Sequence, residues 1–279
     1  MSSYSLGLYE KSMPHHMTLR DKLANAKASG FDFMEVSIDE TDEKLSRLYW
    51  DAILRREIVD AIADTGTPIG SMCLSGHRKY PFGSTDAATR SKSLDIMARA
   101  IDLAVNWGIR IIQLAGYDVY YEESSDKTLA YFRENLVKAV DMAAKSGVIL
   151  AFETMETPFM DTVEKAMHYI ADLNSPYLQI YPDLGNLTNA AELYGHTVIG
   201  DMKTGLGHIS AMHIKETMPG KYRDIPYGTG HVDFLAGINT ARKLGVCRFV
   251  GEFWDNGDYQ AQIDHANKFL RSFFEKMEV

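Results

Sequence analysis

The sequence predicts a single α/β domain folded as a (β/α)8 TIM barrel that spans residues 1–279. Short apolar runs alternate eight times with longer segments of helical period, and repeated β-then-α units are typical of this barrel. No G-x-G-x-x-G motif follows the first run, which argues against an open dinucleotide-binding sheet. The chain is long enough for one large core, and no linker-like segment divides it.

The predicted strands are short runs rich in branched and aromatic residues, a composition that favours β structure. In chain order they cover residues 4–9, 31–38, 68–74, 109–115, 148–152, 177–181, 209–214 and 247–253. Helices are predicted from apolar residues that recur every three or four positions. Five of them cover residues 18–29, 126–145, 162–173, 189–194 and 232–244. Three more helices are indicated by apolar stripes. The first stripe is Leu54, Ile58 and Ile62; the second is Leu94, Met97, Ala98, Ile101, Ala104 and Val105; the third is Ile263, Ala266, Leu270, Phe273 and Phe274.

Glycine follows five of these helices and precedes the next apolar run. A residue with positive φ is favoured at the end of a helix, and glycine adopts that conformation without a clash from Cβ. The five positions are Gly30, Gly66, Gly108, Gly147 and Gly245.

Four apolar runs in the second half of the chain end in a residue able to bind a metal ion: Glu153, Asp183, His213 and Glu252. Their strands are neighbours in the predicted barrel, so we expect the four side chains to converge at its carboxyl-terminal end, where barrel enzymes carry their chemistry. Three carboxylates this close would repel one another without a cation. We interpret the set as the ligands of one divalent metal ion, with Mn, Mg, Zn and Co all compatible, and with carboxylates left to move protons.

Polar residues near other strand ends are candidates for substrate contact. Glu35 lies near the end of the second strand, and a structural hydrogen bond in the barrel mouth explains it equally well. Gln113 and Glu10 could likewise contact the substrate or form a structural hydrogen bond. Lys215 lies two residues after His213, so strand alternation points both side chains inward, where the ammonium could polarise a substrate oxygen.

Two loops could bind sugar hydroxyls or a phosphate. Ser75 follows the third strand, and His77, Arg78 and Lys79 add three potential cations beside it. Residues 226–231 are glycine-rich, and backbone N–H groups there, from Gly228 to His231, could surround an anion at a helix N-terminus. The alternative for the loop after the third strand is a solvated loop without a ligand, and the alternative for residues 226–231 is a plain tight turn.

Composition and charge narrow the class of partner. The formal net charge of −9 disfavours a nonspecific contact with the phosphate backbone of nucleic acid. The start of the chain lacks the basic and apolar regions of a signal peptide, and no apolar run reaches the ~18 residues of a membrane span. Cys73 and Cys247 lie in apolar runs and are predicted to be buried, reduced thiols. We therefore expect a cytoplasmic protein without a nucleic-acid or membrane partner.

Five segments carry a family resemblance: Leu8-Tyr9-Glu10-Lys11, Gly30-Phe31-Asp32-Phe33, and the stretches from Ser71 to Arg78, from Gln113 to Tyr121 and from Tyr181 to Leu187. They resemble the L-ribulose-5-phosphate (L-xylulose-5-phosphate) 3-epimerases, which belong to the xylose-isomerase-like TIM barrels. The resemblance runs from Tyr4 to the last helix. It implies a metal held by the same four residues that the strand ends select. Related epimerases of free ketoses carry a histidine where this chain has Asn186.

The resemblance implies metal-dependent epimerisation of a ketopentose 5-phosphate, from L-xylulose 5-phosphate to L-ribulose 5-phosphate, through an enediolate. Glu153 and Glu252 would flank C3 as base and acid, while the other two ligands mainly hold the ion. The candidates for orienting the sugar or its phosphate are His77, Lys215 and the 228–231 turn, and a homodimer is expected.

Three other functions stay open. An epimerase of free ketoses and an aldose–ketose isomerase, including one for a hexulose phosphate, would use the same barrel. A non-catalytic sugar-binding protein would need no pair of facing carboxylates.

Overall fold

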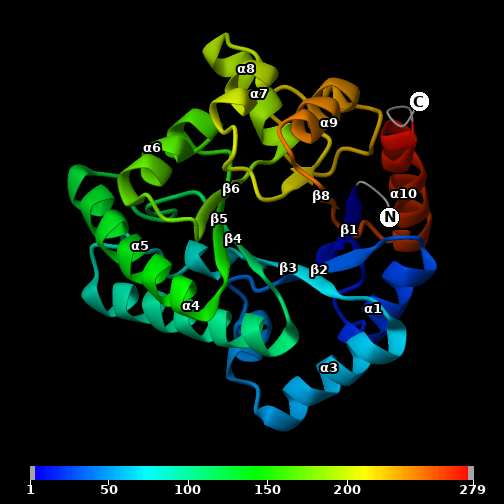
Figure 1. Cartoon of the computed structure of the whole chain (residues 1–279), viewed down its shortest axis with the longest axis horizontal. Helices are drawn as coiled ribbons and strands as arrows, with labels where there is room; N and C mark the ends of the chain where they lie inside the picture. The colour runs from blue at the N-terminus through cyan, green and yellow to red at the C-terminus, as the bar shows by residue number, and fades with distance from the viewer. Residues whose placement is uncertain (1–3, 276–279) are drawn as a thin grey trace.

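The computed structural model describes residues 4–275 and contains the predicted barrel. Eight parallel strands form one sheet in the order β6-β5-β4-β3-β2-β1-β8-β7 (Figure 1). Their bounds are β1 Ser5–Tyr9, β2 Phe33–Ser37, β3 Ile69–Leu74, β4 Ile111–Ala115, β5 Ile149–Glu153, β6 Leu178–Tyr181, β7 Met212–Ile214 and β8 Arg248–Gly251. The predicted fold class is therefore confirmed.

The barrel closes between β6 and β7 through isolated bridges rather than a continuous ladder. Ile180 pairs with Ile209 and Asp183 with His213, and the His213 amide donates to the carbonyl of Pro182 at 2.9 Å. As a result, β7 is shorter than the predicted run over residues 209–214. This weakly paired seam lies where two of the candidate ligands meet.

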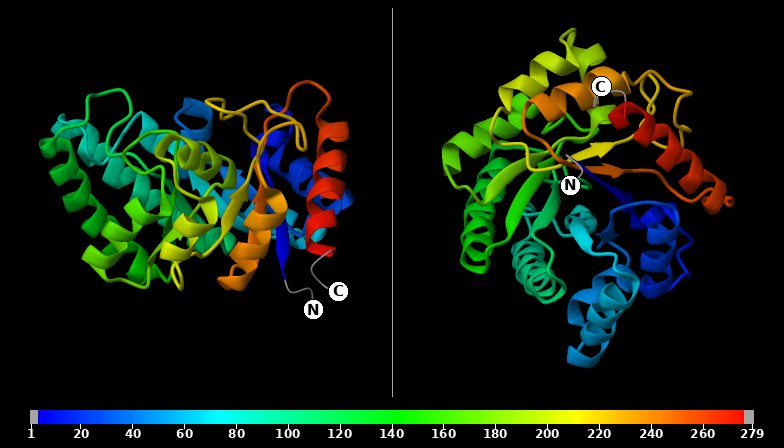
Figure 2. Two further views of the ribbon diagram at one scale, coloured as in Figure 1. Left: turned by 90° about the horizontal axis from the view of Figure 1, so that it is seen from above. Right: turned by 45° about the vertical axis from the view of Figure 1, so that its right-hand side comes forward.

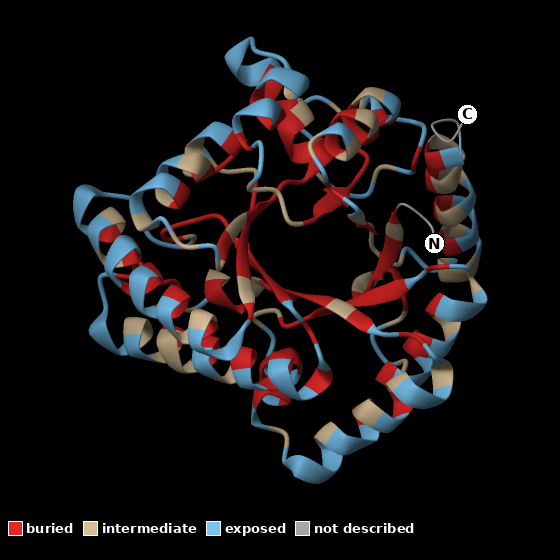
Figure 3. Ribbon diagram, in the orientation of Figure 1, coloured by how far each residue is buried: buried red, intermediate tan, exposed pale blue. Residues whose placement is uncertain are grey.

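Helices surround the sheet and turn their buried residues toward it (Figures 1 and 3). The helices that follow the strands are α1 Leu19–Ala28, α3 Ala52–Thr65, α4 Ala87–Trp107, α5 Asp126–Ser146, α6 Val163–Leu173, α7 Leu184–Tyr194, α9 Phe234–Lys243 and α10 Tyr259–Glu275. Sequence patterns missed the short helices α2 Asp42–Ser46 and α8 Val198–Thr204 and the 3-10 turns η1 Glu10–Ser12, η2 Arg47–Tyr49 and η3 Ser75–Arg78. These elements are too short to show a helical period.

Capping side chains account for the helix boundaries. At the start of α5, the Ser125 hydroxyl accepts from the Thr128 amide, and the Thr128 hydroxyl accepts from the Ser125 amide, which satisfies two donors that the first turn leaves free. At the helix ends, Gly108 and Gly147 have φ of 74° and 68°. The predicted left-handed conformation is confirmed at all five glycine positions.

The buried face of α4 differs from the predicted stripe. Met97, Ile101 and Ala104 are buried as expected, but Ala98 and Val105 are exposed. The helix packs on its neighbours α3 and α5 as well as on the sheet, so its buried face is broader and rotated from that stripe. It also includes Ile96, Ala100, Leu103 and Trp107.

A layer of large side chains fills the interior of the barrel below its carboxyl-terminal end. The ring of Phe33 lies against the backbone of two neighbouring strands, and a Cβ added to Gly7 or Gly70 would lie 2.3 Å from it. The two glycines therefore provide the space that this ring needs. Tyr9, Ile111, Ala151, Tyr181 and Val250 belong to the same cluster. The loops after β7 and β8 lie together at one end of the barrel (Figure 2), and residues from these loops line a pocket.

Both cysteines are free thiols, as predicted. Cys73 is buried, but Cys247 is exposed, so the burial predicted for it is wrong. Cys247 precedes β8, and only its carbonyl joins the barrel, by accepting from the Ser5 amide at 2.8 Å. In the stretch 4–275, no helix has the length and apolar character needed to span a membrane.

Candidate metal centre

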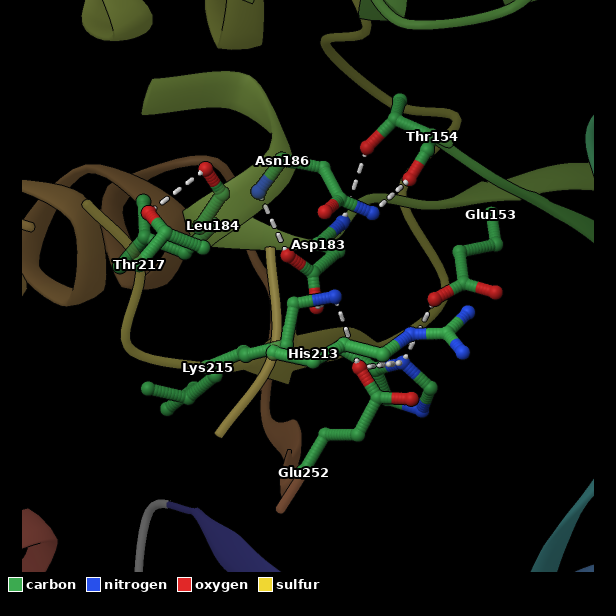
Figure 4. Close-up of polar contacts among 12 residues, drawn as sticks. Glu153, Thr154, Asp183, Leu184, Asn186, His213, Lys215, Thr217 and Glu252 are labelled. Carbon is green, nitrogen blue, oxygen red and sulfur yellow. Dashed lines mark hydrogen bonds and ion pairs between the residues drawn. The ribbon is translucent and has the colours of Figure 1, made fainter. Parts of the chain in front are cut away.

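The four predicted metal-binding side chains converge at the carboxyl-terminal end of the barrel. Glu153 ends β5, Asp183 lies between β6 and α7, His213 lies within β7, and Glu252 directly follows β8. All four are buried, and one ligand atom from each lies within 4.8 Å of the others. Figure 4 shows them pointing toward a common point, with Lys215 beside them.

Asp183 is held in place by the start of α7. Its Oδ1 accepts a hydrogen bond of 2.7 Å from the Asn186 amide, and its own amide donates to the Thr154 hydroxyl at 3.0 Å. Because Asp183 caps the helix, α7 begins at Leu184, five residues before the predicted start at 189. The cap uses one carboxylate oxygen and leaves Oδ2 buried without a hydrogen bond.

The imidazole of His213 uses its two nitrogens differently. Nε2 lies 2.6 Å from Oε1 of Glu35. Nδ1 faces the other ligands, at 3.1 Å from Oε1 of Glu153 and 3.6 Å from Oε2 of Glu252. Gln113 donates from Nε2 to the second oxygen of Glu153. The ring is therefore oriented from β2, and the Glu153 carboxylate from β4.

A buried ammonium lies among the carboxylates. Nζ of Lys215 is 3.3 Å from Oδ2 of Asp183 and 3.1 Å from Oε2 of Glu252. Burial alone would lower the pKa of Lys215, but these two carboxylates outweigh it and raise that pKa. The lysine stays charged and offsets part of their negative charge.

Burial and neighbouring charges together give the three carboxylates very different pKa values. It raises the pKa of Asp183 to about 7, against the opposing charge of Lys215. Burial, followed by repulsion from Glu252, also raises the pKa of Glu153. Burial acts in the same direction on Glu252, but the charges of Lys215 and His213 outweigh it and lower that pKa to about 2. One ammonium cannot balance three buried carboxylates, whereas a divalent cation would relieve their repulsion.

The geometry of the group fits such an ion. Ligand atoms at roughly 2.1 Å from a tetrahedral ion lie about 3.4 Å apart, which agrees with the 3.1 and 3.6 Å separations around His213 Nδ1. Oδ2 of Asp183 and Oε2 of Glu252 accept no hydrogen bond of good geometry, so each has a lone pair to offer. Oxygen and imidazole donors suit Mn, Zn, Mg or Co. The group could thus bind one divalent metal ion.

A pocket opens directly above this group. Glu153, Glu252 and Lys215 line it, together with Trp254 and Asn186. The amide oxygen of Asn186 is buried without a hydrogen-bond partner, while its nitrogen donates to the Thr154 carbonyl at 2.7 Å. Other lining residues are Tyr9, Cys73, Met155 and Glu156, with Lys11, Ser75, Arg78 and Arg223 adding a hydroxyl and three cationic groups.

The predicted substrate contacts divide into two groups. Lys215 and Ser75 line the pocket, and Glu35 lies beneath it, fully buried against His213. The structure does not bring His77, Gly228 or His231 to the pocket lining.

The rings of His77 and His231 and the amide of Gly228 each bond to other parts of the protein instead. The ring of His77 turns under α4, where Nε2 lies 3.1 Å from the Ser93 carbonyl. The amide of Gly228 donates to Glu216 at 3.0 Å, and the ring of His231 contacts Thr217 and Glu192. These bonds hold the loop after β7 together rather than leaving donors free for an anion.

Sequence reasoning missed several pocket residues. Arg223 and Trp254 come from loops without a recognisable pattern, and the guanidinium of Arg223 lies 5.3 Å from the centre of the indole ring. Lys11 lies in a segment that carries the family resemblance, and that was the one available signal for it. Loop residues of this kind become neighbours only when the barrel closes.

Fold and site together define a class, the xylose isomerase-like TIM barrels, and the model of that family matches residues 23–273. A protein of Shigella boydii serotype 18 named L-ribulose-5-phosphate 3-epimerase UlaE is 43% identical over 96% of this chain and 94% of its own length. The protein of that name from Salmonella heidelberg is 46% identical over 89% of this chain and 87% of its own length. This chain belongs to the L-ribulose-5-phosphate 3-epimerase family within that class, which confirms the resemblance seen in the sequence.

A solved structure supports the fold independently. The structure of an L-ribulose 3-epimerase superposes with a TM-score of 0.76, over 100% of this chain and 97% of that one, at 19% identity. At this identity the match concerns the fold alone.

Proposed function

We propose that this protein is a metal-dependent 3-epimerase that interconverts L-xylulose 5-phosphate and L-ribulose 5-phosphate. The observation that carries the proposal is the pair of buried glutamates, Glu153 and Glu252, which line one pocket and belong to one candidate metal centre. The name of the 43%-identical relatives supports the substrate class.

Epimerisation at C3 removes a proton next to a carbonyl and returns one to the opposite face of the carbon. Glu153 comes from β5 and Glu252 follows β8, so they reach the pocket from different strands. One acts as the base and the other as the acid, and they exchange roles with the direction of the reaction. Gln113 orients the first glutamate, and Lys215 holds the second in its ionised form.

Asp183 and His213 would complete the ligand set for the ion. A bound divalent ion supplies Lewis-acid stabilisation of the negative charge that develops on the substrate oxygens. The ammonium of Lys215 lies among the ligand carboxylates and lines the pocket, so it could donate a hydrogen bond to one of the same oxygens. Asn186 offers an unpaired amide oxygen to a sugar hydroxyl.

The cations at the pocket rim are our candidates for the 5-phosphate. Arg78 is half-buried and its Nε has no hydrogen-bond partner. Lys11 pairs with Asp39 at 2.6 Å and Arg223 with Glu156 at 3.6 Å. Both distances are shorter than the 4.0 Å between Arg78 and Glu40, so Arg78 is the least neutralised of the three. We therefore assign the main phosphate contact to Arg78, assisted by the hydroxyl of Ser75, in the loop that the sequence indicated.

The test is turnover of a small substrate panel with product assignment by NMR. We expect L-ribulose 5-phosphate to be converted to L-xylulose 5-phosphate, with loss of activity in chelator and with deuterium at C3 when the solvent is D2O. The unphosphorylated ketoses should react more slowly. Product recovered without deuterium at C3 would exclude the enediolate route.

The same panel separates the alternatives. Hydrogen transfer between C1 and C2 would identify an aldose–ketose isomerase, and faster turnover of free ketoses would identify a free-sugar epimerase. Binding without any turnover in the presence of metal would identify a sugar-binding protein. The homodimer and the cytoplasmic location stay predictions, and light scattering of the purified protein tests the first.

A further inference from the structure

We propose that Glu35 is a positioning residue that determines which nitrogen of His213 faces the metal centre. The proposal rests on the proposed metal centre, but not on the identity of the sugar. The sequence indicated Glu35 as a possible substrate contact. Its surroundings point instead to a role beneath the substrate pocket.

Glu35 lies on β2, opposite the strands that supply the candidate ligands, and its side chain is fully buried. Oε1 lies 2.6 Å from Nε2 of His213. Oε2 accepts hydrogen bonds from the Ser71 hydroxyl at 2.6 Å and the Tyr181 hydroxyl at 2.8 Å. Both carboxylate oxygens are therefore occupied, and three residues from other strands fix the direction of the group.

These bonds determine where the imidazole proton lies. An ionised carboxylate can only accept hydrogen bonds, so Nε2 of His213 must carry the hydrogen that lies between the two groups. Nδ1 faces Glu153 and Glu252 at 3.1 and 3.6 Å, and in the metal-free protein it can share a second hydrogen with Glu153. A bound cation would replace that second hydrogen, so Nδ1 is the nitrogen that can offer a lone pair to the metal while Nε2 keeps its hydrogen. A carboxylate behind a histidine ligand fixes the tautomer and the ring orientation and makes the ligand more basic.

Packing around the ring limits any other arrangement. The ring of Tyr181 lies against that of His213, with centroids 4.8 Å apart and planes inclined by 67°. Glu35 itself is fully buried and does not line the pocket, and His213 occupies its Oε1. This placement supports a role for Glu35 beneath the substrate pocket rather than a direct contact with the sugar.

The first test is the metal affinity of Glu35→Gln, measured by competition with a chromophoric chelator for Zn²⁺ in the absence of sugar. Glutamine keeps the volume, but it removes the charge and can present an NH₂ group to Nε2, which favours the wrong tautomer. We expect binding about 10- to 100-fold weaker. Tyr181→Phe removes only one donor to Glu35, so it should weaken binding less.

Asp118→Asn is the matched control. Asp118 is a buried carboxylate that accepts from the hydroxyls of Ser124 and Thr128 at 2.8 and 2.5 Å, with no histidine attached. It should leave Zn²⁺ affinity within about twofold of the wild type. Equal weakening in both variants, or an unchanged affinity of Glu35→Gln, would overturn the proposal.

A second test uses the wild-type protein, so it does not depend on the folding of a variant. In the long-range ¹⁵N–¹H spectrum of the Zn²⁺-loaded wild-type protein, His213 should show a metal-bound Nδ1 and a protonated Nε2. The opposite assignment refutes the role of Glu35. Neither measurement involves a sugar, so weakened metal binding in a protein without epimerase activity would reject the proposed function and support the role of Glu35.

Discussion

The ammonium of Lys215 lies 3.1 Å from Oε2 of Glu252, inside the group of side chains that would hold a metal ion. Both side chains are buried. In the metal-free protein this contact offsets negative charge that would otherwise be unpaired. A bound divalent cation would repel the ammonium, so metal binding should weaken the pair and free Lys215 to face the substrate.

Lys215→Met should therefore destabilise the metal-free protein more than the metal-loaded one. Removing one partner of a buried ion pair costs roughly 3–5 kcal/mol, and each kcal/mol corresponds to about 2–4 °C in Tm for a chain of this size. We expect a larger increase in Tm on adding metal than in the wild type, together with lower kcat. Lys221→Met, which changes an exposed lysine in the same loop, is the control. An unchanged metal-induced shift in Lys215→Met would contradict this account.

Glu153→Gln and Glu252→Gln should each lower kcat by about 10²- to 10⁴-fold, because each removes one of the two groups that move the C3 proton. Each variant should still incorporate solvent deuterium into the epimer whose proton faces the remaining glutamate. NMR of each epimer in D2O measures this directly. Glu156→Gln alters a carboxylate at the pocket rim outside the ligand set and should have a small effect. A near-normal rate in Glu252→Gln would remove that residue from proton transfer.

Removal of the metal should abolish turnover and lower stability without unfolding the barrel. The four ligand side chains come from four adjacent parts of the sheet, so the ion adds binding energy to a site already formed. At a metal concentration 100 times its Kd, the stabilisation is about 2.7 kcal/mol. Differential scanning fluorimetry and activity, each after dialysis against chelator and after adding back Mn, Zn, Mg or Co, test both effects. Full activity in metal-free protein would refute the assignment.

The convergence of the four candidate ligands could be predicted from the sequence because local rules fix it. Strand alternation and the barrel topology determine that Glu153, His213 and Glu252 meet at one end. The contact between Glu35 and His213 could not be predicted, since the two residues are 178 positions apart and nothing local indicates that they meet. His77 shows the same limit, because a 3-10 turn after β3 directs its ring under α4.

The buried cluster around Glu10 should make stability depend on pH in a way that one variant can isolate. Burial raises the pKa of Glu10, but Arg47, Lys44 and Lys22 outweigh it and hold that pKa well below its usual range. Its stabilising contribution is therefore complete above the unfolded-state carboxyl pKa of about 4.3 and is lost as the pH falls below that value.

Glu10→Gln should lower the free energy of unfolding at pH 7 by roughly 3–5 kcal/mol, and its difference from the wild type should narrow below about pH 4.3. Urea unfolding of both proteins between pH 7 and pH 3.5 measures this difference. Glu43→Gln changes an exposed neighbour and should give no such trend. A difference that stays constant with pH would mean that Glu10 is not the titrating group.

Arg78 is the last residue of η3 and Lys79 follows it directly, yet of the two only Arg78 lines the pocket. The guanidinium of Arg78 lies 4.7 Å from the centre of the Tyr120 ring, whereas Lys79 is exposed and its ammonium is 3.8 Å from Asp42. If Arg78 binds the 5-phosphate, Arg78→Met should raise KM for L-ribulose 5-phosphate by about 10-fold or more, since a charge-assisted contact contributes roughly 1.5–3 kcal/mol. KM for free L-ribulose should change little, because that substrate has no phosphate to lose. Lys79→Met should leave both values near those of the wild type. If Arg78→Met raises KM equally for both sugars, its role is to shape the pocket and the phosphate binds elsewhere.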